Sequence, residues 1–240
     1  MILYSGLPDH LVLRQLRRLY DENITYEERN EEATLLLQGV KLVSASCWWD
    51  PAYGAVGKGD GSVIACVYTS DDGRYWLHAI RYLTIDTTAQ LDEARQQCHQ
   101  VTDFIKTYHL PSVTVETNGV GKFLPGLLRN VFQERGLSCA VVEHHSSKPK
   151  DQRIIEAYDA ALAAGNLMAH RSVWDTPYIM EMREWTPGSS RQAVDDGLDA
   201  VAGCLQSQPV RLKRDTTTKT YPRKWHGLGQ SLKADSDFNL

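Results

Sequence analysis

The order of strand-like and helix-like segments constrains the fold of this chain more than any other feature of its sequence. Three strand-like stretches come first, separated by turn-rich segments, which favours consecutive antiparallel pairing. Short apolar strands then alternate with helical patterns, as they do in parallel sheets. The strands are LVSASCWW, SVIACVYTS, RYWLHAIRYL, SVTVET and CAVVEH, and helices are expected near residues 88–108, 123–135, 151–164, 177–184 and 193–205.

This order predicts an α/β fold with a mixed sheet of three antiparallel strands followed by two parallel strands, flanked by helices. It is the order of the ribonuclease H-like fold, although other α/β sandwiches share it. We expect this domain to span residues 37–206. Residues 1–36 are predicted to be a helical lead-in or linker, because residues 7–20 place apolar side chains at helical spacing and the acidic residues 21–34 suit a boundary or a second helix. Residues 207–240 are predicted to be a basic, flexible tail.

The composition excludes several classes of protein. With 240 residues, 42% of them apolar and 23% charged, the chain suits a globular protein of one large domain with extensions. The five cysteines lack CxxC spacing, which argues against a disulfide framework or a structural zinc site. No apolar stretch is long enough to cross a bilayer and the N-terminus lacks the order of an export signal, so we expect a cytoplasmic protein without a membrane partner.

The net charge of −4 gives the whole chain no attraction to nucleic acid, but the charge is unevenly distributed. Residues 211–226 carry six Lys/Arg against one Asp, a local sum of +5. Such a tail could contact phosphate or an acidic protein surface, or could be a solvated end.

Two acidic residues lie at the ends of predicted strands. Asp50 ends the first strand and precedes Pro51, which biases Asp50 towards an extended backbone, although a turn-forming Asp before Pro is the alternative. Glu116 ends the apolar strand VTVE, where its unpaired burial would be costly. At the C-terminal end of a strand it can instead face a crevice, which is where α/β sheets bind ligands.

Three aspartates follow in one predicted helix, within the stretch AVDDGLDA. Asp195 and Asp199 lie one turn apart, and Asp196 is three residues before Asp199, so all three can point into one small volume. Taken alone, this segment is compatible with either a solvated acidic face or a cation site. With Asp50 and Glu116, however, the helix offers hard oxygen ligands from three separate elements, which suits Mg²⁺ or Mn²⁺. Two such ions can activate a water and stabilise the leaving oxygen of a phosphodiester.

Other motifs give weaker signals. GAVGKGDG and TNGVGK lack the spacing of a phosphate-binding loop, so the sequence shows no ATPase site. Lys58, in the first of these stretches, is a candidate phosphate contact beside Asp50. His144 and His145 alternate faces at a strand end, so at most one of them is expected to face the site.

Together these motifs resemble the C-terminal nuclease domain of the large terminase subunit of tailed bacteriophages. The resemblance rests on SCWWDPAYG, VTVETNGVGKFL, HHSSKPKDQRIIEAYDAALAAGNLMAH and DDGLDAVAG, which lie within residues 37–205. It implies a ribonuclease H-like fold and a metal-dependent endonuclease that cuts double-stranded concatemeric DNA by two-metal hydrolysis. Residue by residue, it implies that Asp50, Glu116 and Asp199 are catalytic metal ligands for Mg²⁺ or Mn²⁺, with Asp196 as an additional ligand.

The resemblance also implies DNA contacts and partners. Lys148 and Arg153 match the family's basic pair and are expected, with Lys58, to contact DNA, although Arg153 could equally lie on a helix surface. Full-length family members carry a packaging ATPase domain, whose Walker motifs this sequence lacks. They act with the portal protein and the small terminase subunit in the cytoplasm of the infected bacterial host.

Two alternatives stay open at this point. One is another ribonuclease H-like nuclease, such as a junction resolvase, which would differ in its preference for substrate shape. The other is a catalytically silent assembly or portal-docking module, in which the basic tail binds a protein partner.

Overall fold

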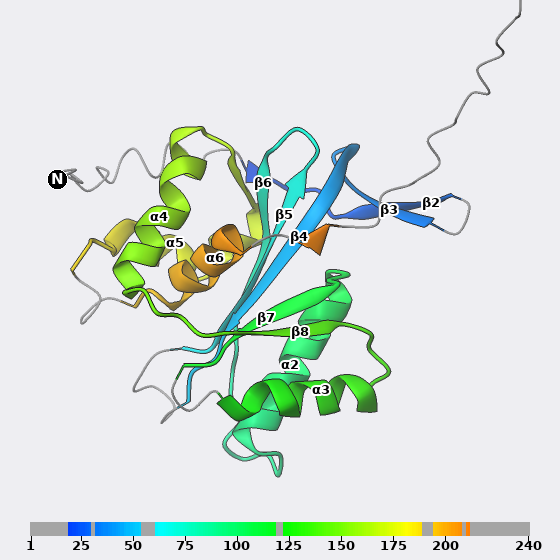
Figure 1. Cartoon of the computed structure of the whole chain (residues 1–240), viewed down its shortest axis with the longest axis vertical. Helices are drawn as coiled ribbons and strands as arrows, with labels where there is room; N and C mark the ends of the chain where they lie inside the picture. The colour runs from blue at the N-terminus through cyan, green and yellow to red at the C-terminus, as the bar shows by residue number, and fades with distance from the viewer. Residues whose placement is uncertain are drawn as a thin grey trace, which may run out of the picture.

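A computed structural model describes residues 19–29, 32–53, 61–118, 122–188, 194–207 and 210–211, and it consists of one mixed sheet between two layers of helices (Figure 1). Within these residues the sheet has ten strands, seven of which follow the spatial order β1-β9-β6-β5-β4-β3-β2. The remaining three, β7, β8 and β10, branch from the β4 side of this path.

Three long antiparallel strands form the centre of the sheet: β4 (Val40–Asp50), β5 (Val63–Ser70) and β6 (Tyr75–Tyr82). Two parallel strands follow, because β7 (Ser112–Glu116) lies parallel to β4, and β8 (Ala140–His144) lies parallel to β7. The predicted mixed sheet of three antiparallel strands followed by two parallel strands is therefore confirmed.

Helices cover both faces of this sheet, so its central strands are apolar on both sides. Along β4, Cys47 and Trp49 point into one core and Trp48 into the other, as the two-residue period of a strand requires. Helices α2 (Glu93–Thr107) and α3 (Leu124–Glu134) cover the Trp49 face. The Trp48 face is covered by α4 (Lys150–Ala163), α5 (Tyr178–Glu184) and α6 (Asp196–Gln206), with the short 3₁₀ helix η2 (Arg171–Asp175).

Local sequence explains where these helices begin. Asp92 caps α2, since its side chain accepts a hydrogen bond from the Arg95 amide at 2.9 Å, and Pro125 lies in the first turn of α3. All five predicted helices are present, with ends that differ by a few residues from the predicted ones. Within the described ranges, none of the helices combines the length and the apolar character that a bilayer-crossing segment needs.

Helix α6 packs very closely on the centre of the sheet. A Cβ atom added at Gly203 would collide with the indole ring of Trp48, so the absence of a side chain lets the helix backbone rest on that ring. This contact fixes which face of α6 turns towards the sheet. It therefore also fixes where the aspartates at the N-terminal end of the helix point.

The helical lead-in predicted for residues 1–36 is wrong where the structure describes it. Those residues form β1 (Leu19–Tyr20), β2 (Thr25–Arg29) and β3 (Glu32–Leu37). β1 pairs parallel with β9 (Leu167–His170), while β2 and β3 form an antiparallel hairpin that continues into β4. Pairing with an existing sheet overrides a weak local helical pattern. The rest of the predicted lead-in, residues 1–18 and 30–31, lies outside the described residues.

The predicted C-terminal tail is described at its beginning alone. There, β10 (Val210–Arg211) pairs antiparallel with β4 at Ala45 and Ser44. Residues 208–209 and 212–240 lie outside the described residues, so the flexibility and the partner of the tail stay predictions, as does the division of the chain at residues 36 and 206.

Candidate metal centre

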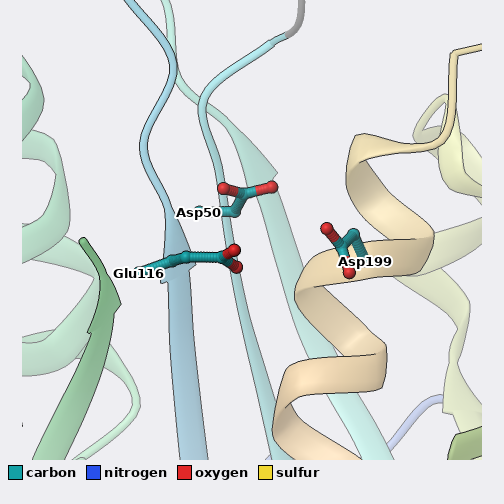
Figure 2. Close-up of side chains that lie close together, drawn as sticks. All are labelled: Asp50, Glu116 and Asp199. Atoms are coloured by element: carbon teal, nitrogen blue, oxygen red, sulfur yellow. The ribbon is translucent and has the colours of Figure 1, made fainter. Parts of the chain in front are cut away.

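Three carboxylates from three elements meet at one end of the sheet (Figure 2). Asp50 is the last residue of β4, Glu116 is the last residue of β7, and Asp199 lies in the first turns of α6. One oxygen from each lies within 4.8 Å of the others. Such convergence of oxygen donors is the geometry in which Mg²⁺ and Mn²⁺ bind.

The fold brings these residues together for simple reasons. β4 and β7 are parallel neighbours, with Trp48 opposite Thr114 and Trp49 opposite Val115, so their C-terminal ends lie side by side. Both strands end in an acidic residue, which places Asp50 and Glu116 at the edge where parallel sheets bind ligands.

All three carboxylates are withdrawn from water. Glu116 is 5% exposed and Asp199 is 2% exposed, whereas Asp50 is partly exposed as a residue. Burial raises the pKa of the Asp50 carboxyl well above its ordinary value, and the nearby charges of Asp199 and Glu116 raise it further. Burial also raises the pKa of Asp199, to about 7, although Lys150 and Arg153 oppose that rise. Crowded carboxylates of this kind favour a bound cation.

Arg153, on α4, connects two of the three carboxylates. Its Nη1 donates to Glu116 Oε2 at 3.0 Å, and its Nη2 donates to Asp199 Oδ2 at 2.8 Å. The other oxygen of Glu116 accepts from Asn118 Nδ2 at 2.7 Å. The guanidinium therefore holds the β7 carboxylate and the α6 carboxylate in a fixed relation.

The other two aspartates of the α6 segment face Lys150 rather than the three converging carboxylates. The Lys150 ammonium lies 2.6 Å from Asp195 Oδ1, 3.2 Å from Asp196 Oδ1 and 3.9 Å from Asp199 Oδ2. Asp196 Oδ2 also accepts from the Gly61 amide at 2.6 Å. Burial disfavours the charged form of Lys150, but the surrounding carboxylates outweigh it and raise the pKa of this lysine.

The residues present fit a divalent cation. Five carboxylates, those of Asp50, Glu116, Asp195, Asp196 and Asp199, lie around the two cations Lys150 and Arg153, which leaves a formal charge of −3 if all are ionised. Within the described part of the chain, Asp199 Oδ1 and Asp195 Oδ2 are buried without a hydrogen-bond partner. A cation bound by these oxygens would compensate both their lack of a hydrogen-bond partner and the excess negative charge around them.

Some of the predicted site residues lie in the carboxylate cluster and others lie beside it. Asp50, Glu116 and Asp199 come together, and Arg153 contacts two of them, while Asp196 faces Gly61 and Lys150. Their roles as ligands stay predictions.

Of the three predicted DNA contacts, Arg153 lies within the carboxylate cluster, where its hydrogen bonds go to Glu116 and Asp199, and its contact with DNA stays a prediction. Lys148 donates to Glu156 Oε2 at 2.6 Å on the exposed surface and does not join the carboxylates. His144 packs edge-on against the ring of Trp48. Lys58 lies outside the described residues.

Sequence reasoning missed Lys150, the lysine that does enter the cluster. The predicted helix began at residue 151, which left Lys150 in the preceding loop, whereas α4 begins at Lys150 itself. The signal was the spacing of Lys150 and Arg153, since residues three apart share a face of a helix.

Comparisons with known proteins agree with the fold. A family model described as Terminase RNaseH-like domain matches residues 47–207, which include all three converging carboxylates. The crystal structure of the HK97 bacteriophage large terminase is similar with a TM-score of 0.55 and 10% identity, over 83% of this chain and 43% of that chain. At this identity the similarity supports the fold alone.

Two further solved structures are more distant. The human cytomegalovirus terminase nuclease domain gives a TM-score of 0.49 at 13% identity, over 66% of this chain and 80% of that one. A variant of the nuclease domain of the large terminase subunit of bacterial virus Sf6, with manganese, gives a TM-score of 0.49 at 10% identity, over 69% of this chain and 89% of that one. No curated protein sequence matches the chain.

Proposed function

Because the chain belongs to the terminase RNaseH-like domain family, we propose that it is the metal-dependent endonuclease that cuts concatemeric double-stranded viral DNA during genome packaging. The observation that carries this proposal is the convergence of Asp50, Glu116 and Asp199 within 4.8 Å. Family membership supports the reaction class, and the carboxylate cluster supports the place at which the reaction would occur.

Asp50, Glu116 and Asp199 are the residues that would hold two divalent ions, Mg²⁺ or Mn²⁺, with Asp196 as a further ligand. When bound, such ions lower the pKa of an attacking water and neutralise charge on the leaving oxygen of a phosphodiester.

The chain's own residues would orient this site and its substrate. Arg153 fixes the directions of Glu116 and Asp199 through its two hydrogen bonds, so these two donors keep one arrangement. Lys148, whose side chain is 54% exposed, and Lys58 are proposed to contact the DNA backbone. Contacts of this kind go to phosphates and carry no base sequence, so we expect little sequence selectivity.

The partners follow from the same proposal. In the terminase holoenzyme this domain would act with a packaging ATPase domain, the portal protein and the small terminase subunit, in the cytoplasm of the infected bacterial host. The basic sequence of residues 211–226 is a candidate for contact with DNA or with an acidic protein partner.

The test is plasmid cleavage by the chain in Mn²⁺, Mg²⁺ or EDTA. We expect metal-dependent nicking and linearisation that both Asp50→Asn and Asp199→Asn abolish, because each removes a charged ligand without changing the shape of the side chain. Asp159→Asn, at an exposed position of α4, is the matched control and should cut normally.

Three outcomes would change the proposal. Cleavage that survives in both site variants would overturn the assignment of the site. A strong preference for branched DNA over plasmid would indicate a junction resolvase instead. Intact plasmid under every metal, from folded protein, would favour the assembly-module alternative.

A further inference from the structure

The N-terminus of α6 is capped from outside its own segment. Asp195 occupies the N-cap position, yet its side chain makes no capping hydrogen bond and its Oδ1 lies 2.6 Å from the Lys150 ammonium instead. The amide of Leu198, three residues on, is one that an N-cap side chain ordinarily satisfies. It donates instead to Oε2 of Glu181 at 3.0 Å.

Glu181 is well placed for this task. It lies on α5 and is 5% exposed, and its other oxygen, Oε1, accepts from the hydroxyl of Tyr82 at 2.7 Å. A Cβ added at Gly197 would collide with both the Tyr82 hydroxyl and Glu181 Oε2. A carboxylate from α5 and a hydroxyl from β6 therefore press directly against the first turn of α6.

We propose that Glu181 is a positioning residue for the metal centre. By capping α6 it frees Asp195 to bind Lys150, and by holding the turn between Asp196 and Asp199 it sets the direction of both side chains. A negative charge at this end of a helix is also favourable, because it complements the helix dipole. The inference rests on the proposed function, since it assigns a role in arranging that same site.

The geometry indicates that this cap affects the metal centre as well as the stability of α6. The residue that donates to Glu181 directly precedes Asp199 in the chain, so a shift of that amide moves the metal-facing carboxylate with it. Carboxylate ligands must keep their arrangement to bind Mg²⁺ or Mn²⁺ tightly, and residues that orient such ligands ordinarily influence metal affinity by about 10–100-fold.

The experiment measures Mn²⁺ binding by the decrease of the free-Mn²⁺ electron paramagnetic resonance signal, with plasmid cleavage as a parallel readout. We expect Glu181→Ala to raise the half-saturating Mn²⁺ concentration by about 10–100-fold. Glu181→Gln keeps an acceptor for the Leu198 amide and should restore binding close to wild type. Glu184→Ala, exposed at the end of the same helix, is the matched control and should bind Mn²⁺ like the wild type.

A folded Glu181→Ala protein, judged by its near-ultraviolet circular dichroism, that binds Mn²⁺ like the wild type would overturn the inference. If that variant does not fold, Tyr82→Phe decides, because it removes one hydrogen bond to Glu181 and keeps the ring. We expect folded Tyr82→Phe to bind Mn²⁺ more weakly, and unchanged binding would overturn the inference.

Failure of the proposed function gives different results. A wild-type protein that binds Mn²⁺ but cuts no DNA would contradict the nuclease proposal, while the comparison of Glu181 variants would still decide the positioning role. A folded wild type that binds no Mn²⁺ at all would overturn both.

Discussion

Replacing Asp199 by asparagine is expected to stabilise the metal-free protein while removing its response to metal. Asp199 is 2% exposed, and burial raises its pKa to about 7 even though Lys150 and Arg153 lie beside it. Asparagine has nearly the shape of protonated aspartic acid and carries no charge. The variant therefore avoids the cost of ionising this buried side chain.

The raised pKa determines both the sign and the size of the effect. In the unfolded chain Asp199 ionises near 3.8, but in the folded chain it does so near 7, so between these values the folded state holds a proton that the unfolded state has lost. The stabilisation from this group is fully present below about pH 4 and is lost as the pH rises through 7. About three pKa units at 1.36 kcal/mol each give an upper bound of about 4 kcal/mol.

The assay is urea unfolding followed by tryptophan fluorescence, in EDTA, at several values between about pH 4 and pH 8. We expect Asp199→Asn to exceed the wild type in free energy of unfolding by up to about 4 kcal/mol near pH 8, and to match it near pH 4. Added Mn²⁺ should raise the melting temperature of the wild type and leave that of the variant unchanged. The control is Asp159→Asn, at an exposed position, which should behave like the wild type throughout.

Two results would refute this reasoning. If the variant is no more stable than the wild type near pH 8 without metal, ionising the buried Asp199 carboxyl does not destabilise the folded protein. If Mn²⁺ stabilises the variant as much as the wild type, Asp199 is not a ligand, and the site would have to be built from the other carboxylates.

Three further predictions concern packing and charge. Burial, aided by His170, lowers the pKa of His78 to about 4, so the free energy of unfolding should fall by up to about 3 kcal/mol as the pH drops from 6.5 to 4. Urea unfolding should show this pH dependence in the wild type and not in His78→Phe. Gly203→Ala should destabilise the protein by about 1–3 kcal/mol in thermal unfolding, because the added methyl group collides with Trp48; an unchanged melting temperature would contradict the close packing of α6. Arg153→Gln should cost about 3–5 kcal/mol in EDTA, because it removes the guanidinium that two buried carboxylates share, and Mn²⁺ should recover part of that loss in the same unfolding assay.

The sequence by itself determined the central sheet and the presence of a carboxylate site. The apolar runs of β4 and β5 and the strand–helix order that follows are local patterns, and a sheet covered on both faces by helices is what they specify. Asp50 and Glu116 each end a strand, so their meeting at one edge follows once those strands are parallel neighbours.

The tertiary structure alone decided how the α6 segment contributes. Helical spacing allowed three aspartates to share one direction, but the contact of Gly203 with Trp48 and the cap from Glu181 rotate the helix so that Asp199 alone of them joins Asp50 and Glu116. Helical periodicity gives the relative angles of side chains within a helix, whereas the rotation of the whole helix depends on what it packs against.

The same distinction explains the other differences. The segments of β1 and β3 carry a weak local preference, so pairing with β9 and β4 determined their structure. Lys150 rather than Lys148 enters the cluster because α4 begins one turn before Arg153 and directs both side chains to the same face. Local patterns are set by neighbours in sequence, but the partners of a charged side chain come from segments distant in the chain, and the packed fold alone brings those together.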